Sequence, residues 1–106
     1  SVLDSMHFDM AKILITELFR VLKEESSCFI DVISAYDQRL PSGFDGELIV
    51  DTLHEYGTVQ SYFGLEKIKD LVREKFTIEN CYEITNQNLS NNLSHGRIYV
   101  ELKRIG

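Results

Sequence analysis

The chain has 106 residues, of which 43% are hydrophobic and 26% are charged, a composition typical of one globular domain. Its formal net charge of −6 argues against a nucleic-acid-binding surface over the whole molecule, because such surfaces are basic. No apolar run approaches the roughly 20 residues that span a bilayer, so no membrane partner is expected. We expect residues 1–106 to form a single domain that is a fragment of a larger protein.

Two helices are predicted in the first 40 residues. Apolar residues recur at helical spacing over 8–25, with charged residues between them, which predicts a long amphipathic helix. The segment 28–39 is predicted to be a second helix, because Phe29, Val32 and Tyr36 fall at helical offsets and strict alternation fails. A serine that can cap the helix precedes this segment, and a proline that would stop the helix follows it.

In the rest of the chain the spacing of the apolar residues changes after residue 76. Helices are predicted over 45–56, where Gly57 stands as a C-terminal glycine, and over 65–76, with a turn or a short extended piece between them. Beyond them, 77–84 and 97–103 show the period of two that is typical of strands. The two strands, joined by a polar tip, predict a β-hairpin. Four helices followed by a C-terminal hairpin predict an α+β, winged-helix-like fold.

No residue pattern predicts a metal site, a cofactor or catalysis. Cys28 and Cys81 show no metal-ligand spacing with His7, His54 or His95. The stretch "PSGFDGE" lacks the spacing and the lysine of a phosphate-binding loop, and no third group orients a cysteine–histidine pair. The N-terminal stretch carries too many charges for a secretory signal, so we expect two reduced thiols in an intracellular protein.

Two stretches carry a resemblance to a known family. The stretch "KILITELFRVLKEESSCFIDVISAYDQRL" resembles the first two helices of the C-terminal winged-helix domain of the origin-recognition-complex large subunit and its Cdc6-type relatives. Phe29, Val32 or Ile33, and Tyr36 match the second helix of that family. The end of the chain, "GRIYVELKRI", is similar to the family's final strand, in which a basic residue opens an aliphatic run.

The resemblance, in particular to the family's yeast silent-information-regulator paralogue, implies a function. It implies a non-catalytic module for protein association, above all homodimerisation, in a nuclear factor of chromatin silencing or of replication origins. The partners would be a second copy of the chain and other chromatin proteins. Two alternatives stay open: direct binding of duplex DNA, and an RNA-recognition-like module similar to "IVDTLHEYGTVQSYFG".

Apolar and aromatic residues outside the expected core predict the interface, because such side chains carry most interface energy. The predicted interface residues are Tyr62, Phe63, Leu89, Leu93 and Tyr99.

Under the DNA-binding alternative, the exposed face of the helix over 65–76 would enter the major groove and the hairpin would touch the backbone. Acidic residues interleave with the basic ones on that helix, and the hairpin tip holds no lysine or arginine, which weighs against this alternative. The candidate DNA-binding residues are Lys67, Lys69, Arg73 and Arg97.

Overall fold

The computed structural model describes residues 3–35, 46–49 and 59–105 of the chain. These residues form one short 3-10 helix, two α-helices and five strands. In chain order the elements are η1 (Leu3–Ser5), α1 (Phe8–Val21), β1 (Ser27–Ser34), β2 (Glu47–Ile49), β3 (Val59–Phe63), α2 (Leu65–Val72), β4 (Phe76–Gln87) and β5 (Ser94–Arg104).

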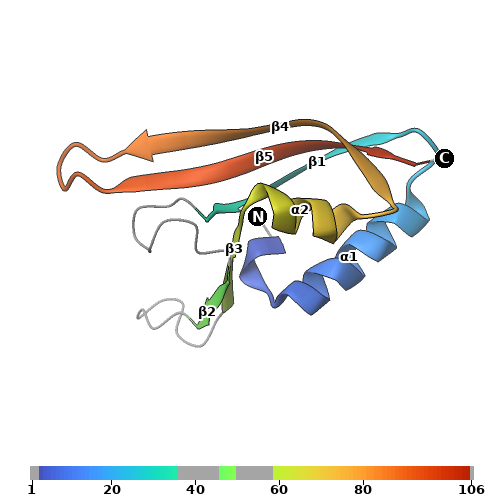
Figure 1. Cartoon of the computed structure of the whole chain (residues 1–106), viewed down its shortest axis with the longest axis horizontal. Coiled ribbons are helices and arrows are strands. Elements are labelled where there is room, and N and C mark those ends of the chain that lie inside the picture. The colour runs from blue at the N-terminus through green and yellow to red at the C-terminus, as the bar shows by residue number, and fades with distance from the viewer. Residues whose placement is uncertain (1–2, 36–45, 50–58, 106) are drawn as a thin grey trace.

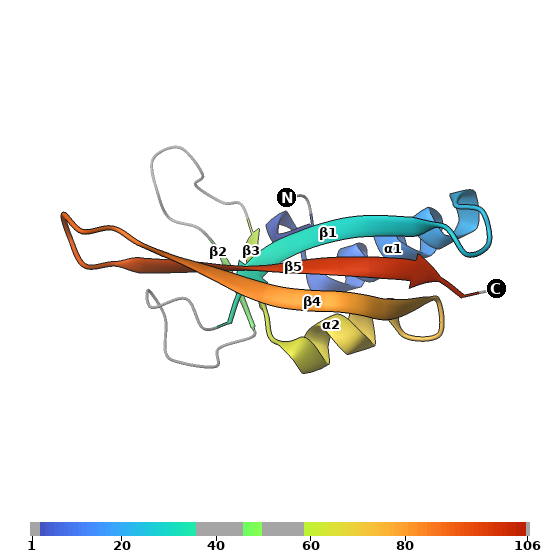
Figure 2. The ribbon, with the colours of Figure 1, turned by 90° about the horizontal axis from the view of Figure 1, so that it is seen from above.

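The five strands form one mixed sheet in the order β2-β3-β1-β5-β4. β1 runs parallel to β3 and antiparallel to β5, and the pairs β2–β3 and β4–β5 are antiparallel. Both α-helices lie on the same face of the sheet (Figures 1 and 2). β4 and β5 continue beyond the other strands as a two-stranded arm, seen on the left of Figure 1.

The core lies between the helices and the sheet. Alternate residues of β5 face the helices, because side chains alternate between the two faces of a strand. They meet apolar residues of α1 and α2, and Phe19 packs edge-on against Phe76 with 6.0 Å between ring centroids. The buried core residues of these three elements are Ala11, Ile15, Ile68, Leu71, Val72, Ile98, Val100 and Leu102.

The segment 28–39 is not the helix that its spacing predicted. Its first part is β1, which pairs with β5 along seven residues, and residues 36–39 lie outside the described part. Ile30 and Val32 face the helices, whereas Ile33 is buried on the other face. A strand with apolar residues on both faces shows no alternation, and its sequence then resembles a helix.

The prediction of a helix over 45–56 is also wrong for the residues of this segment that the structure describes. Glu47–Ile49 forms the edge strand β2, which pairs with β3, and residues 50–56 lie outside the described ranges. Only three residues of β2 are described, too few to show a period of two. The short extended piece expected before the last helix is β3.

Three predicted elements are confirmed in type. Helices stand at Phe8–Val21 and Leu65–Val72, each about one turn shorter than predicted. The β4–β5 hairpin is present, but a bulge between Ile78 and Asn80 shifts its register. Because of this bulge Cys81 packs on the core, whereas the predicted alternation placed Tyr82 on the face of Ile78.

The predicted fold class is therefore wrong. A winged helix of four helices and a hairpin does not describe two α-helices packed on one face of a five-stranded mixed sheet. The error follows from the reading of 28–39, because a strand there places β5 beside β1 rather than in an isolated wing. No helix in the described ranges is long and apolar enough to cross a membrane.

Candidate functional site

The parallel strands β1 and β3 end side by side at one edge of the sheet. The Ala35 N–H, just past β1, donates to the Phe63 carbonyl oxygen at 2.8 Å, and Gly64 then opens α2. In open α/β sheets ligands bind outside the carboxyl ends of the parallel strands. This edge, called the carboxyl edge below, is therefore the candidate site.

An ion cluster around the buried Asp4 lies beside the carboxyl edge. Asp4 of η1 accepts the Ile33 N–H at 3.0 Å and the Arg97 guanidinium at 2.9 Å, and Arg97 also donates to Asp31 at 3.0 Å. Burial by itself lowers the pKa of Arg97, but the attraction of Asp4 and Asp31 outweighs it and the pKa is raised. The cluster fixes the N-terminal segment against β1 and β5.

Ser34, the last residue of β1, is fully buried and donates a hydrogen bond to the Glu83 carboxylate of β4. Gly96 of β5 lies against it, because a Cβ at Gly96 would stand 3.0 Å from the Ser34 Cβ. A larger residue at Gly96 would force these strands apart. The buried hydroxyl is closed to a substrate, so Ser34 serves packing rather than nucleophilic chemistry.

Glu47 connects β2 to the start of α1. Its carboxylate accepts the Phe8 N–H, and the other oxygen lies 2.6 Å from His7 Nδ1. The first N–H groups of a helix have no partner within the helix and favour an anion. The hydrogen bond from His7, followed by that from Phe8, lowers the pKa of Glu47.

Lys67 of α2 is held against β3. Its ammonium donates to Ser61 Oγ at 3.0 Å and to the Tyr62 carbonyl oxygen at 2.9 Å. The same ammonium lies 4.5 Å from the centroid of the Phe63 ring, a distance at which a cation is attracted to the ring face. These contacts position α2 relative to the carboxyl edge.

The two cysteines are half-buried and free of disulfides. Burial raises the pKa of both Cys28 and Cys81, which disfavours the reactive thiolate. Neither thiol has the electropositive setting of a catalytic cysteine in this arrangement. Within the described ranges no three histidine, cysteine, aspartate or glutamate side chains stand close enough to hold a metal ion.

The predicted interface residues are separated in the structure. Tyr62 and Phe63 are buried in β3, so the expectation of an exposed aromatic turn is wrong for this pair. Leu89 and Leu93 are exposed at the tip of the arm. Tyr99 lies on the sheet face away from the helices and stacks on Tyr82, with 5.7 Å between ring centroids. Whether the exposed residues of this set contact another chain stays a prediction.

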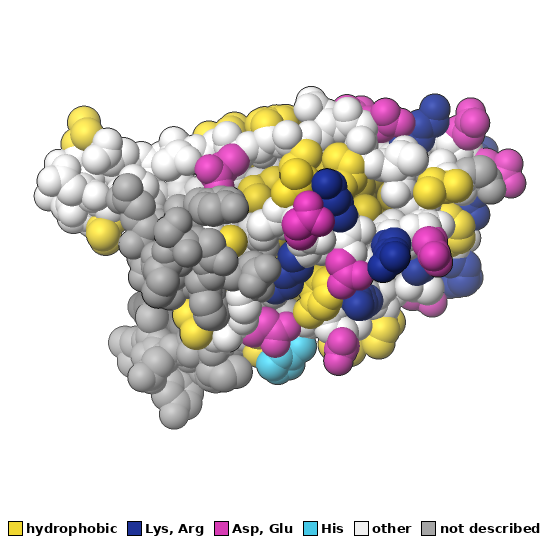
Figure 3. All heavy atoms as spheres, viewed as in Figure 1, with side chains coloured by type: hydrophobic (Ala, Val, Ile, Leu, Met, Phe, Trp, Pro, Cys, Tyr) yellow, Lys and Arg dark blue, Asp and Glu magenta, His cyan; other side chains and the backbone are white. Residues whose placement is uncertain are grey.

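The candidate DNA-binding residues do not share a free basic face. Lys67 and Arg97 are engaged as described above, and Lys69 lies 3.4 Å from the Glu66 carboxylate. Arg73 follows the end of α2. In Figure 3 blue and magenta side chains alternate over the helical part, and the arm on the left carries almost no charge. A mixed surface of this kind gives little attraction for phosphates.

Several residues of the carboxyl edge were not found from the sequence. Asp4, Asp31, Ser34 and Glu83 belong to no motif, and Asp4 lies 93 positions from its partner Arg97. A lone acidic residue ahead of a helix is ordinarily read as a helix-start signal. Nothing in the local pattern indicates a partner that distant.

Comparison with known proteins gives a fold but no family. No family model matches the sequence, and no curated protein matches it. Among solved structures the chain is similar to a SAM-dependent methyltransferase from Methanosarcina mazei, with a TM-score of 0.67 and 12% sequence identity. The similarity covers 92% of this chain and 52% of that chain. The chain thus spans about half the length of this neighbour, and the likeness shows the fold alone.

This likeness overturns the resemblance to the origin-recognition and Cdc6 family. The fold is that of a protein described as a methyltransferase and not of a winged helix. The expected non-catalytic association module of chromatin silencing and the DNA-binding alternative are therefore wrong, because both rested on the winged helix. The RNA-recognition-like alternative rested on the stretch "IVDTLHEYGTVQSYFG" instead, and it is overturned by the likeness to a methyltransferase fold. Nuclear localisation and the association of copies stay predictions.

Proposed function

We propose that the chain is part of a SAM-dependent methyltransferase and forms the portion of its α/β domain that carries the β4–β5 hairpin. One observation carries the proposal. Nearly the whole chain superposes on the Methanosarcina mazei methyltransferase, while 52% of that protein is covered. The sheet is mixed, with strand order β2-β3-β1-β5-β4, and both helices lie on one of its faces, which is a specific arrangement. Because the similarity to the neighbour covers 92% of a chain with this arrangement, it limits the folds that the chain can be assigned to.

The described residues do not fit SAM by themselves. A nucleoside in such a sheet is held by a glycine turn after a parallel strand and by a carboxylate on its ribose. Gly64 follows a parallel strand, but a Cβ there would meet no protein atom within 4 Å, so packing within the described part of the chain does not require glycine. The nearby carboxylates of Asp4, Glu47 and Glu83 each hold a protein group.

The described residues therefore contribute to methyl transfer by closing the site and not by holding the donor. The carboxyl edge is fixed from three directions, by the Asp4–Arg97 pair, by the Ser34–Glu83 hydrogen bond and by Lys67 on β3. A rigid edge of this kind can orient a methyl acceptor against a donor bound by the other part of the domain.

The test joins the 106-residue chain to the part of the Methanosarcina mazei protein that has no counterpart here, in the order that the superposition gives. The joined protein and the 106-residue chain are titrated with SAM by calorimetry. We expect binding by the joined protein and none by the chain alone. A joined protein that unfolds cooperatively but binds no SAM would contradict the proposal.

A pair of tryptophan substitutions tests the place of the site. Gly64→Trp puts bulk at the carboxyl edge, where a side chain meets open space. Ser27→Trp puts the same bulk at the opposite, exposed end of β1. In the joined protein we expect Gly64→Trp to weaken SAM binding or methyl transfer by about tenfold, which corresponds to 1.4 kcal/mol, and Ser27→Trp to change neither. Equal effects of the two would place the site elsewhere.

A further inference from the structure

The β4–β5 arm extends past the carboxyl edge and not past the opposite end of the sheet. β1 pairs with β5 as far as Ile33 and Arg97, and the β4–β5 ladder continues from there to Gln87 and Ser94. The three further strand residues add about 10 Å, and the tip 88–93 lies beyond them. In Figure 1 the arm extends to the left from the end of β1 that carries Ser34. A molecule that reacts at the carboxyl edge therefore has the arm beside it.

The root of the arm is fastened to the end of β1. Glu83 of β4 accepts a hydrogen bond from Ser34, the last residue of β1. Gly96 of β5 lies so close that a Cβ there would stand 3.0 Å from the Ser34 Cβ. Both contacts are next to the last β1–β5 pair, at Arg97, so the arm leaves the sheet in a defined direction.

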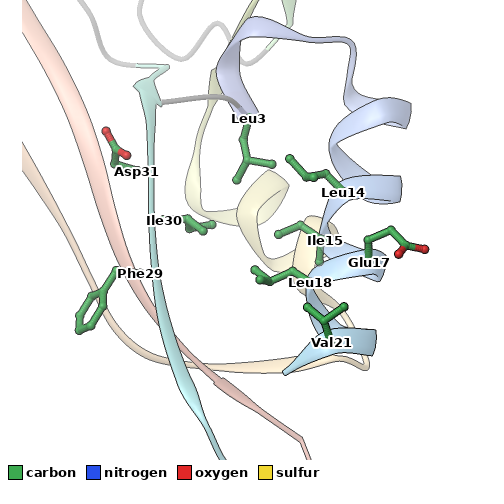
Figure 4. Close-up of a pocket in the computed structure, with 9 residues that line it drawn as sticks. All are labelled: Leu3, Leu14, Ile15, Glu17, Leu18, Val21, Phe29, Ile30 and Asp31. Atoms are coloured by element: carbon green, nitrogen blue, oxygen red, sulfur yellow. The ribbon is translucent and has the colours of Figure 1, made fainter. Parts of the chain in front are cut away.

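The apolar groove between α1 and β1 extends the other way. It has a volume of about 550 Å³ and is lined on β1 by Phe29, Ile30 and Asp31. Figure 4 shows Leu3 and Val21 near its two ends, with Val21 toward the amino end of β1. A molecule in this groove lies along β1 behind the carboxyl edge, so the groove and the arm do not form one binding surface.

The tip of the arm is uncharged and rich in amide groups. Between Ile84 and His95 the sequence has no acidic or basic residue, and it has five asparagine or glutamine side chains. Two leucines stand among them, of which Leu89 is 85% exposed and Leu93 is 41% exposed. Asparagine side chains accept the N–H groups of Ser90 and Leu93 and so hold the turn in shape. The tip thus presents amide groups and apolar side chains on a folded turn.

These properties select the kind of molecule that the tip can bind. Phosphate groups need cations, so a nucleic acid finds little attraction here. A small acceptor held at the carboxyl edge is about 10 Å or more from the tip and does not touch it. A polypeptide matches the tip, because each of its peptide groups, like an amide side chain, has both a donor and an acceptor. Its apolar side chains can also cover the exposed Leu89.

The outer edge of β4 gives a second means of binding a polypeptide. β4 is the last strand in the order β2-β3-β1-β5-β4, so within the described ranges no strand pairs with its outer edge. From Ile84 to Gln87 the strand has neither the lysine nor the proline that commonly blocks pairing at an edge. An extended segment binds such an edge through main-chain hydrogen bonds.

We propose that the arm binds the methyl acceptor and that this acceptor is a polypeptide. The inference rests on the proposed function, because it needs methyl transfer at the carboxyl edge. The tip and the outer edge of β4 hold the polypeptide, and one of its side chains reaches the carboxyl edge. In the transfer the lone pair of the acceptor atom forms the bond to the methyl carbon. The electron pair of the broken carbon–sulfur bond stays on sulfur, and the proton of the acceptor atom passes to solvent.

The experiment uses the joined protein, SAM with a tritiated methyl group, and a whole-cell extract of the organism that makes the chain as the pool of acceptors. Parallel samples are treated with protease, treated with ribonuclease, or passed through a filter that retains macromolecules. We expect the filter to retain the label, protease to release it, and ribonuclease to leave it unchanged.

Matched variants place the contact on the arm. Residues 88–93 are replaced by Asn-Gly, and Leu89→Ser removes a single exposed side chain. Ile13→Ser is the control, because Ile13 is 57% exposed on α1. With SAM affinity unchanged in calorimetry, we expect labelling at low extract concentration to fall about tenfold without the tip and about threefold with Leu89→Ser. Ile13→Ser should not change it. Because the loss is in acceptor binding, a higher extract concentration should restore part of the rate.

Three outcomes would overturn the inference. They are label in RNA or in molecules that pass the filter, protein labelling that is the same with and without the tip, and a joined protein that binds SAM but labels no polypeptide. A joined protein that is folded and binds no SAM would instead refute the proposed function, so the two failures are distinguishable.

Discussion

Arg97 is a side chain that joins three separate parts of the fold. It reaches from β5 to Asp4 of η1 and to Asp31 of β1. Asp4 is 4% exposed, and it also accepts the Ile33 N–H. A buried carboxylate is tolerated only when charge and hydrogen bonds compensate for lost hydration. Arg97 is the cation that supplies this compensation.

Replacing Arg97 should therefore leave a buried carboxylate without its cation. We expect Arg97→Gln to lower the free energy of unfolding by about 2 kcal/mol, measured by urea denaturation at neutral pH. Arg20→Gln is the matched control, because Arg20 forms an exposed pair with Glu17 on α1, and such pairs contribute little. If the two variants were equally stable, the cluster would not hold the N-terminal segment.

The link between Asp4 and Arg97 shows a limit of sequence reasoning at the residue scale. Arg97 was recognised as a functional candidate, but as a phosphate-binding cation. Nothing local distinguishes an arginine on a strand that is exposed from one that reaches a carboxylate 93 positions away. Its role depends on β5 lying beside β1, which is a property of the sheet order.

At the scale of elements, the end of α2 has an identifiable cause. The helix stops at Val72, and Glu74 follows with a φ of 65°. The Lys75 N–H then donates to the Val72 carbonyl oxygen at 3.1 Å. A left-handed residue after a helix is usually glycine, since a Cβ there is strained. The absence of glycine is why the sequence predicted a helix that continues to residue 76.

Glycine at position 74 should relieve this strain. We expect Glu74→Gly to raise the free energy of unfolding by about 1 kcal/mol, and Glu74→Ala to leave it nearly unchanged because the Cβ remains. Lys69→Gly, in the exposed interior of the same helix, should lower it by roughly 1 kcal/mol. Urea denaturation of the three variants measures the differences. A destabilised Glu74→Gly variant would mean that the Glu74 side chain makes a contact worth more than the strain.

Elements with one buried face were predictable, and those with two were not. α1, α2 and the hairpin each bury one periodic apolar face, although α1 also exposes apolar residues beside that face. All three elements were found from the sequence. β1 carries apolar residues on both faces, and its Phe29 and Val32 matched helical spacing by coincidence. Tyr62 and Phe63 of β3 were assigned to a surface turn for a similar reason, because a short buried strand resembles an aromatic loop.

At the scale of the whole molecule, the arm makes the chain elongated. Its principal extents are 46 × 27 × 20 Å and its radius of gyration is 14.6 Å, against about 13 Å for a compact domain of this length. The tip residues 88–93 are exposed, and their described backbone bonds, between Asn88 and Leu93 and between Asn92 and Asn88, stay within the tip. The arm is therefore an appendage to the sheet and not part of the core.

Shortening the arm should leave the rest of the molecule intact. Gln87 and Ser94 are partners in the β4–β5 ladder, so residues 88–93 can be replaced by Asn-Gly, which favours a two-residue hairpin turn. We expect the longest dimension to shrink by a few ångström in X-ray scattering, at about 3.3 Å per strand residue. Thermal unfolding should be almost unchanged, and the joined protein should bind SAM as before, since the carboxyl edge lies outside the tip. A large fall in the unfolding midpoint would show that the tip packs on the body, whereas a loss of SAM binding alone would make the arm part of the site.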